Sequence, residues 1–452
     1  MQAKSRSLAL VVLAAGAGTR MMSDLPKPLH PLGQAPLLAH ALASAAPLAP
    51  SRIIVVTGHG ADAVEAALAD IAPEAVSVRQ AEQLGTGHAV LQAAEMLQGF
   101  EGDAVVLYAD TPFIRAETLD AMRAARGAHD VVMLGFEAAD PTGYGRMIMD
   151  GEALSRIVEH KDASDAERQI SLCNSGLLCA DAQVLIALLR KVGNANANGE
   201  YYLTDVPELA TQAGLSATVV VCDEDETRGI NSRAELARAE AQFQALRRTE
   251  ALENGVTLQA PETVFFALDT WVGRDAEIEP NVVFGPGVTV ESGARIRAFS
   301  HLEGAHVSAG AIVGPYARLR PGAEIGNDAR IGNFVEIKAA EIGEGAKVNH
   351  LTYVGDATVG ARANLGAGSV TCNYDGVMKH RTEIGEDAFI GSDTMLVAPV
   401  KVGARAMTAS GSVVTEDVPE AALALGRAKQ VNKPGLAVKL MDRLRAIKAK
   451  KG

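Results

Sequence analysis

Aromatic residues and cysteines are scarce in this chain of 452 residues. Only 4% of the residues are aromatic, although 48% are hydrophobic, so the cores must be filled mainly by Val, Ile, Leu and Ala, as in narrow repetitive coils. The four cysteines Cys173, Cys179, Cys222 and Cys372 lack the paired spacing of a zinc site. We therefore expect reduced thiols in the cytoplasm.

The chain also lacks an excess of positive charge and any long apolar run. The net charge of −13 argues against nucleic acid and an anionic membrane as partners, and no stretch approaches the ~20 apolar residues of a membrane span. Lys4 and Arg6 precede an apolar run at residues 8–17, a composition that a secretory signal could share. We interpret this run as a buried parallel strand that ends in a glycine turn.

The length of the chain predicts at least two domains. In the first half, apolar runs at residues 9–14, 52–57, 104–109 and 131–136 alternate with helix-like segments. This alternation predicts a doubly wound, Rossmann-like α/β domain with a parallel sheet, and ligands bound beyond the carboxyl ends of its strands.

A polar segment at residues 232–254 predicts a connecting helix. Ser232 and Glu235 form a capping-box pattern, and one apolar stripe is predicted, made of Leu236, Ala239, Phe243 and Leu246. The domains are thus expected at 1–231 and 255–432, joined by this helix. A basic tail at 433–452 is expected to be solvated or packed on a neighbouring subunit.

Aliphatic residues recur at every sixth position in the second half, with occasional five-residue steps. They are Ile278, Phe284, Val290, Ile296, Leu302, Val307, Val313, Leu319, Ile325, Ile331, Ile337, Ile342, Val348, Val354, Val359 and Leu365. Neither a helix nor a simple strand repeats at six, so the pattern predicts a solenoid of short parallel strands. The repeat resembles the hexapeptide-repeat, left-handed parallel β-helix family, a scaffold for acyl transfer from coenzyme A. A break at residues 371–382 predicts an extruded loop.

A glycine-rich turn follows the first predicted strand and reads LAAGAGTR at residues 13–20. Its glycines allow backbone N–H groups to approach a phosphate, and Arg20 and Lys27 can neutralise the charge of a triphosphate during attack. Taken alone, such a turn could be only a turn. Likewise Asp110 could serve as a helix N-cap, because Thr111 and Pro112 follow it as at a helix start.

The motifs continue in order along the first half. They are QAEQLGTGH at 80–88, YAD at 108–110, GYGR at 143–146, EHKD at 159–162, CNSG at 173–176 and GIN at 229–231. Together with the glycine-rich turn they resemble sugar-1-phosphate nucleotidyltransferases. With the solenoid added, nearly the whole chain resembles the family of bifunctional N-acetylglucosamine-1-phosphate uridyltransferase/glucosamine-1-phosphate acetyltransferases.

The resemblance implies a uridyltransferase site with three parts. The catalytic cations would be Arg20 and Lys27, and Mg²⁺, which prefers hard oxygen ligands, would be held by Asp110 and Asn231. The nucleotide and sugar would be bound by Leu13, Ala14, Ala15, Gly16, Lys27, Gln80, Gly85, Thr86, Tyr108, Ala109, Asp110, Gly145, Glu159, Asn174 and Asn231. Two positions depart from the family: Ala17 stands where relatives often have Lys, and Ala109 where Gly is usual.

The solenoid carries a second constellation. Arg320 and Lys338 lie one three-strand coil apart, so they can stack on one face and hold a sugar phosphate. His350 fits a general base, because an imidazole can take the proton of an attacking amine near neutrality. His301 and His306 are out of phase with His350, which argues against a shared zinc site.

The resemblance places the remaining solenoid residues around the two substrates. Tyr353 and Asn364 would contact the amino sugar, while acetyl-CoA would be bound by Ala367, Asn373, Tyr374, Ser392, Ser410 and Arg427. Ser410 replaces a usual Ala.

Three classes of function remain open at this point. The first is a two-site enzyme that acetylates glucosamine-1-phosphate with acetyl-CoA and then joins the product to UTP, supplying UDP-N-acetylglucosamine for bacterial envelope polymers. The second is a nucleotidyltransferase whose β-helix only oligomerises, and the third is a scaffold without catalysis. The complete residue sets in both halves favour the first. We also expect a homotrimer with the acetyl-transfer site at the subunit boundary, because the flat faces of one solenoid cannot enclose both substrates.

Overall fold

The chain divides into two compact units, Met1–Arg247 and Arg248–Gly452. The computed structural model describes residues 6–450, so Lys4 lies outside the described part. Within that part, no helix combines the length and apolar character of a membrane span.

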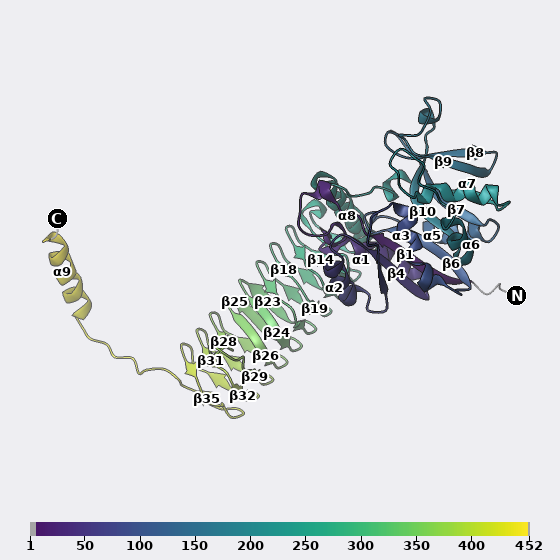
Figure 1. The fold of residues 1–452 in the computed structure, drawn as a ribbon. Coiled ribbons are helices and arrows are strands. Elements are labelled where there is room, and N and C mark those ends of the chain that lie inside the picture. The colour runs from purple at the N-terminus through teal and green to yellow at the C-terminus, as the bar shows by residue number, and fades with distance from the viewer. Residues whose placement is uncertain (1–5, 451–452) are drawn as a thin grey trace. The chain divides into compact units, whose positions relative to one another are not determined.

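The first unit is built on one mixed sheet, with strand order β11-β7-β10-β6-β1-β4-β5 (Figure 1). These strands are β1 (Ser7–Ala14), β4 (Arg52–Thr57), β5 (Val76–Arg79), β6 (Gly102–Tyr108), β7 (Val131–Glu137), β10 (Leu172–Asp181) and β11 (Ala217–Cys222). The doubly wound α/β class is confirmed, but the sheet is not wholly parallel, because β10 runs antiparallel to both β6 and β7. Two smaller pairs accompany the sheet, β8 (Arg146–Asp150) with β9 (Ala153–Val158), and β2 (Pro31–Leu32) with β3 (Ala35–Pro36).

Helices cover both faces of this sheet, as alternate side chains of β1 show. Val11 belongs to one buried cluster and Val12 to another on the opposite face. The helices are α1 (Leu37–Ala45), α2 (Ala61–Ile71), α3 (Thr86–Leu91), α4 (Ala94–Leu97), α5 (Ala116–Arg126), α6 (Ala182–Leu189) and α7 (Val206–Gln212). The apolar run after Arg6 is therefore a central strand.

Helix α8 (Arg233–Glu253) occupies the predicted connecting segment. The Ser232 hydroxyl accepts the Glu235 N–H at 3.3 Å, while the Glu235 carboxylate accepts the N–H of Asn231 at 2.6 Å. Ala239 and Phe243 are buried, but Leu246 is 53% exposed, so its place in the apolar stripe was predicted wrongly. The start of α8 thereby holds the backbone of Asn231.

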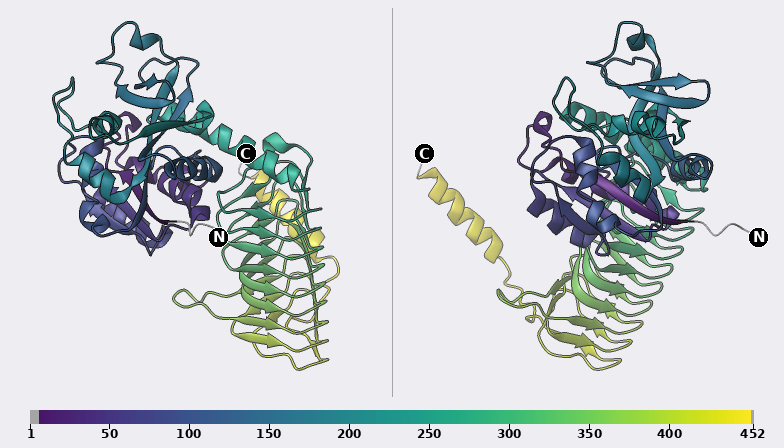
Figure 2. Two further views of the ribbon diagram at one scale, coloured as in Figure 1. Left: turned by 90° about the vertical axis from the view of Figure 1, so that its right-hand side faces the viewer. Right: turned by 45° about the vertical axis from the view of Figure 1, so that its right-hand side comes forward.

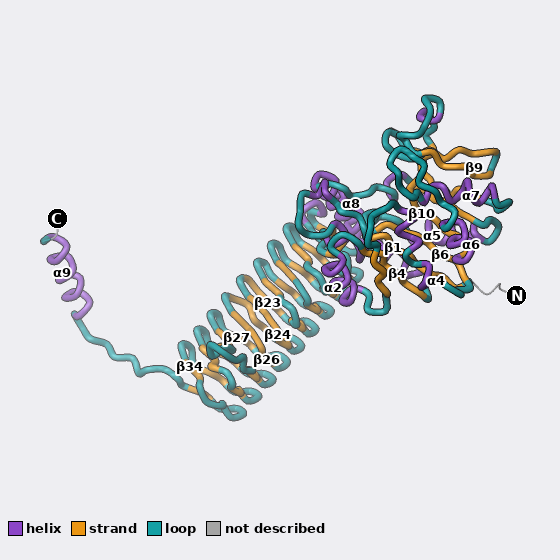
Figure 3. Tube along the Cα trace, in the orientation of Figure 1, coloured by secondary structure: helices purple, strands orange, loops and turns teal. Residues whose placement is uncertain are grey.

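The second unit is a solenoid with three strand faces, and strands and turns alternate along each coil (Figures 2 and 3). The first face contains β12 (Thr257–Leu258), β14 (Glu277–Ile278), β17 (Arg295–Ile296), β20 (Ile312–Val313), β23 (Arg330–Asn333), β25 (Lys347–His350), β27 (Asn364–Leu365), β30 (Phe389–Ile390), β33 (Met407–Thr408) and β35 (Leu423–Ala424). Two long strands, β24 (Glu336–Ile342) and β26 (Tyr353–Val359), turn from the second face onto the third.

The shorter strands of the second and third faces complete the coils. They are β13 (Trp271–Val272), β15 (Val283–Phe284), β16 (Thr289–Val290), β18 (His301–Leu302), β19 (Ala305–Val307), β21 (Arg318–Leu319), β22 (Ala323–Ile325), β28 (Val370–Cys372), β29 (Thr382–Ile384), β31 (Met395–Val397), β32 (Val400–Val402) and β34 (Val413–Val414). The pairings across coils are parallel, as the six-residue repeat predicts.

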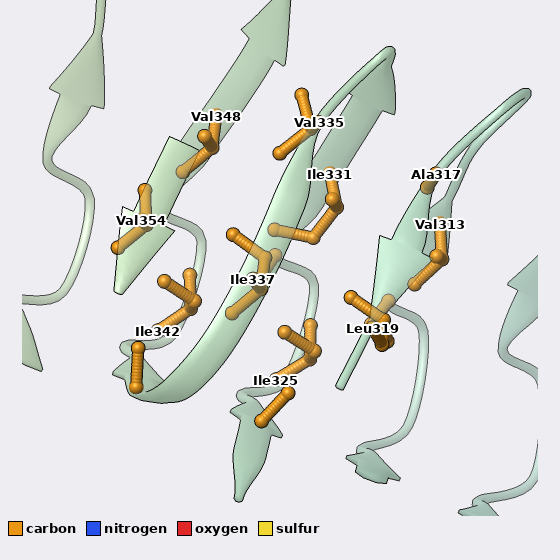
Figure 4. Close-up of a cluster of buried hydrophobic side chains, with 14 of the residues drawn as sticks. Val313, Ala317, Leu319, Ile325, Ile331, Val335, Ile337, Ile342, Val348 and Val354 are labelled. Atoms are coloured by element: carbon orange, nitrogen blue, oxygen red, sulfur yellow. The ribbon is translucent and has the colours of Figure 1, made fainter. Parts of the chain in front are cut away.

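The hexad positions form the core of the solenoid. Every residue of the predicted series from Ile278 to Leu365 is at most 3% exposed, and Figure 4 shows those from Val313 to Val354 turned into the interior. Burying one such side chain typically stabilises a fold by about 1.5–3 kcal/mol. Because each coil adds three of them, the repeat supplies its own stability, and the left-handed β-helix class is confirmed.

One corner of the solenoid carries an aromatic ladder, which we define as Phe299, Tyr316 and Phe334. Neighbouring ring centroids are 4.9 and 5.2 Å apart, with the planes 3° and 18° from parallel. All three residues have φ between 54° and 59°, a left-handed backbone that bulky residues rarely adopt. The rings remain about half exposed.

A loop leaves the solenoid between β28 and β29 and projects from its side (Figure 2, left). Tyr374 and Lys379 pair across this loop, and Val377 is 86% exposed. The predicted tail contains helix α9 (Leu436–Ala449), whose side chains are all exposed.

Candidate active sites

The first unit contains a pocket of about 250 Å³ beyond the carboxyl ends of β1 and β6. The predicted nucleotide residues that line it are Leu13, Ala14, Ala15, Gly16, Lys27, Gln80, Gly85, Thr86, Tyr108, Ala109 and Asp110. Sequence reasoning missed four further lining residues, Pro28, Gln83, Ala89 and Glu200. The pocket is thus assembled from segments far apart in the chain, at the sheet edge where such folds bind ligands.

The glycine-rich turn brings a lysine to the pocket. Gly18 has φ 59°, and a Cβ there would lie 2.7 Å from Cβ of Lys27, so glycine allows the two segments to touch. Lys27 lines the pocket, whereas Arg20 lies on the exposed turn Thr19–Met21 and is not part of the lining.

Lys27 joins the two predicted metal ligands. Its ammonium forms an ion pair with Asp110 and donates to Oδ1 of Asn231 at 2.7 Å. Two hard oxygens from different segments therefore converge on one cation, the Lys27 ammonium, and hard oxygens are the type of ligand that Mg²⁺ prefers. Helix α5 begins only at Ala116, with Arg115 as its N-cap. The N-cap interpretation of Asp110 is therefore wrong, and its carboxylate is available to the pocket.

Tyr108 and Gln80 shape the wall of this pocket. Burial raises the pKa of the Tyr108 phenol, and the Asp110 carboxylate raises it further, so the hydroxyl stays protonated. Gly176 adopts φ 91°, where a Cβ would lie 2.8 Å from the Tyr108 ring. Gln80 is buried and donates to the carbonyl of Gly85 at 3.1 Å, which fixes the loop before α3.

The predicted sugar residues Gly145, Glu159 and Asn174 lie together but outside the lining of the pocket. The N–H of Asn174 donates to the carbonyl of Gly145 at 2.9 Å. A Cβ on Gly145 would lie 3.4 Å from Oε1 of Glu159, so glycine keeps this carboxylate uncovered. Thr204 donates to the same oxygen at 3.1 Å, and burial raises the pKa of Glu159.

Two residues beside the sugar group escaped sequence reasoning. Arg146 is only 1% exposed, and among the described residues its guanidinium has no carboxylate partner. It donates instead to the carbonyls of Tyr144 and Arg168 and to Nδ1 of His160. Its place in the GYGR motif was a signal, but its burial could not be read from the sequence. Burial raises the pKa of Asp205 to about 6.

The solenoid gathers cations on its second face. Arg320 donates to Glu336 at 2.9 Å, and Lys338 lies 3.3 Å from the Asp356 carboxylate. The strand register, which pairs Leu319 with Ile337, places Arg320 and Lys338 side by side on adjacent coils. Lys379, which sequence reasoning missed, reaches them from the extruded loop, and the adjacent Lys338 lowers the pKa of Lys379. Three cations thus lie within interaction range of one another.

His350 and most of the predicted acetyl-CoA residues lie along the same corner of the solenoid as the aromatic ladder. His350 Nδ1 is 2.8 Å from Oδ1 of Asn333. On successive coils Ala367 O accepts from Asp393 N at 2.7 Å, Ser392 O from Gly411 N at 2.8 Å, and Ser410 O from Arg427 Nη1 at 2.8 Å. We call the residues His350, Ala367, Ser392, Ser410 and Arg427 the corner column.

The other predicted acetyl-site residues are on β26, on β27 and on the extruded loop. Asn373 donates to the Tyr353 hydroxyl at 3.3 Å and to Asp356, and Tyr374 is 60% exposed on the loop. Asn364 is on β27, in register with Lys347 of β25. In the described part of the chain, no hydrogen bond joins the corner column to Asn373 or Tyr374.

Comparison with known proteins supports the fold classes found for both halves of the chain. Residues 10–171 match the MobA-like NTP transferase domain, and residues 304–339 match the bacterial transferase hexapeptide family of six repeats. The chain is therefore a nucleotidyltransferase fused to a hexapeptide-repeat transferase.

Curated relatives extend over almost its full length. "Bifunctional protein GlmU" of Jannaschia sp. is 74% identical over 99% of both chains. The proteins of the same name from Ruegeria sp. and Paracoccus denitrificans are 67% and 65% identical over 98% of this chain and 99% of theirs. The chain belongs to the GlmU family and is a bifunctional transferase, which confirms the resemblance found in the sequence.

Proposed function

We propose that the first unit transfers UMP from UTP to N-acetylglucosamine-1-phosphate and that the solenoid makes this substrate by acetylating glucosamine-1-phosphate with acetyl-CoA. Family membership supports the pair of activities. The observation that carries the first assignment is the convergence of Asp110 and Asn231 on Lys27 beside the pocket.

In uridyl transfer, a phosphate oxygen of the sugar attacks the α-phosphorus of UTP and pyrophosphate leaves. Lys27 is placed to neutralise the charge that builds on the phosphates, and Arg20 on its exposed turn would add positive charge. Asp110 and Asn231 would hold Mg²⁺, which would polarise the phosphoryl oxygens. Gly145, Glu159 and Asn174 would bind the sugar.

In acetyl transfer, Arg320, Lys338 and Lys379 would hold the sugar phosphate, with Tyr353 and Asn364 on the sugar. His350 would take the proton of the amine. The corner column, together with Asn373 and Tyr374, would bind acetyl-CoA. We infer that a complete site needs a second copy of the chain, because the exposed faces of one solenoid do not enclose two substrates.

We therefore assign a homotrimer in which the aromatic ladder contacts a neighbouring solenoid. Large stacked rings that are half exposed mark interaction surfaces more often than free surface, and the ladder is continuous with the corner column. A closed ring repeats one heterologous contact three times and makes three equal sites. The four free thiols support a reducing cytoplasmic location.

We place the domain boundary within residues 232–254, between the first domain (1–231) and the solenoid (255–432). Residues 1–253 should then make UDP-N-acetylglucosamine from supplied N-acetylglucosamine-1-phosphate. The test of the whole proposal is an assay of the purified chain with Mg²⁺, UTP, acetyl-CoA and glucosamine-1-phosphate. We expect both free thiol and pyrophosphate. Thiol release without pyrophosphate, or the reverse, would refute one of the two assignments.

A further inference from the structure

Asn333 contacts the predicted base of acetyl transfer directly. Asn333 ends β23 and His350 ends β25, and the two residues are register partners on adjacent coils. Oδ1 of Asn333 lies 2.8 Å from Nδ1 of His350. An amide oxygen can only accept a hydrogen bond, so Nδ1 carries the hydrogen and Nε2 presents its lone pair.

We infer that Asn333 is a positioning residue for acetyl transfer, which holds the His350 imidazole in the tautomer and orientation that let Nε2 act as base. The inference rests on the proposed role of His350. As the amine nitrogen bonds to the thioester carbonyl carbon, its proton passes to Nε2 and the carbon–sulfur bond breaks. The imidazolium then returns that proton to the departing thiolate, so no further reactant is needed.

The choice of an amide rather than a carboxylate has a chemical reason. Both groups can accept from Nδ1, but a carboxylate would stabilise the imidazolium and keep the base protonated to higher pH. An amide orients the ring without adding charge.

In the described part of the chain, Asn333 is the side chain that hydrogen-bonds to the His350 ring. The backbone carbonyl of His350 is held separately, by the Thr352 hydroxyl at 2.6 Å and the Gly368 N–H at 3.3 Å. Strand β27, packed above β25, carries no titratable side chain. Strands β23 and β25 themselves carry Arg330 and Lys347. The titratable groups that line the hollow beside this corner are Tyr316, Arg318, Glu336 and Tyr353.

Two substitutions in the full-length enzyme separate orientation from simple structural support. For Asn333→Asp we expect the acid limb of the acetyl-transfer kcat/KM profile to move up by about one pH unit, the size of effect that a contacting opposite charge produces. For Asn333→Ala we expect kcat to fall on the order of 10- to 100-fold, part of the 10²–10⁴-fold due to a positioned base. The KM for glucosamine-1-phosphate should change little, and uridyl transfer should stay at the native rate.

Asn349→Asp is the matched control, because it adds the same charge beside His350 and, among the described residues, no hydrogen bond joins Asn349 to the ring. An equal pH shift in this variant would show a general field effect and overturn the inference. So would an unmoved Asn333→Asp profile together with native kcat in Asn333→Ala. Full acetyl transfer in His350→Ala would instead refute the base assignment itself, which keeps the two failures distinguishable.

Discussion

The two units build their sites from contacts of very different sequence range. In the first unit, Lys27 meets Asp110 across 83 positions and Asn231 across 204. In the solenoid, His350 meets Asn333 across 17 positions and Lys338 meets Asp356 across 18. A repeat therefore turns sequence spacing directly into geometry, whereas the α/β site depends on the whole topology of its sheet.

The sharpest test of this comparison is a reciprocal pair of substitutions. Asp110→Ala removes an oxygen from the cation site and should lower Mg²⁺-dependent pyrophosphate release on the order of 10²–10⁴-fold, while thiol release from acetyl-CoA persists. His350→Ala should do the reverse by a similar factor. Both rates are measured on each purified variant, with circular dichroism to check the fold. Equal damage to both reactions by either variant would contradict the assignment of one site to each unit.

The second test disrupts the proposed contact between solenoids and leaves the predicted site residues unchanged. Tyr316 stacks on both neighbours in the ladder, so Tyr316→Asp places a charge in the middle of the proposed contact. Aspartate tolerates a left-handed backbone, so the coil itself should remain folded. We expect monomers by light scattering and acetyl transfer at least about tenfold lower, because the proposed site needs a second copy. Uridyl transfer should persist.

Trp271→Asp is the control for that experiment, because Trp271 is an aromatic residue of similar exposure outside the ladder. It should leave both assembly and acetyl transfer at native levels. A Tyr316→Asp trimer with native acetyl transfer would rule out the ladder as the contact.

The third test concerns the long-range support of the sugar group. Arg146 fixes the carbonyls of Tyr144 and Arg168 around Gly145, and Arg146→Lys keeps the charge but loses the planar fork. We expect the KM for N-acetylglucosamine-1-phosphate to rise about tenfold, since small displacements of positioning groups are costly. The KM for UTP should change less than about twofold.

Arg156→Lys gives a matched control on the neighbouring strand β9, because Arg156 is more exposed than Arg146 and forms an ion pair with Glu167 at 2.6 Å. An equal rise of both KM values in Arg146→Lys would indicate general loosening of the unit rather than support of the sugar group.

The same difference in range decides what could be predicted from sequence. The hexad series gave the solenoid core residue by residue, and the spacing of Arg320 and Lys338 gave their stacking. Strand β10 runs antiparallel because a long excursion returns the chain between β6 and β7, and no local pattern encodes that direction. Lys379 and Arg146 were missed for related reasons, since a loop excursion and the burial of a guanidinium depend on tertiary contacts.

The smallest expected effect is on stability, and the dependence of stability on pH should differ between the two units. Solenoid carboxylates such as Glu386 and Asp387 sit on an exposed corner, paired with Arg362. In the first unit, burial raises the pKa of Asp205 from an ordinary 3.8 to about 6. The folded state thus binds this proton more tightly than the unfolded state does. The carboxylate destabilises the fold above pH 6, and this cost fades as the pH falls from 6 towards 3.8.

Asp205→Asn removes the charge and should raise the Tm of the first unit by a few degrees at pH 8, with a smaller gain at pH 4.5. Asp140→Asn is the contrasting variant, because the hydrogen bonds from Thr142 lower the pKa of that exposed carboxyl. The charged form of Asp140 is therefore the favoured one, so its replacement should give no gain at pH 8. Thermal melts of both variants at the two pH values provide the measurement. A gain for Asp205→Asn that is as large at pH 4.5 as at pH 8 would show that the effect does not come from a buried charge.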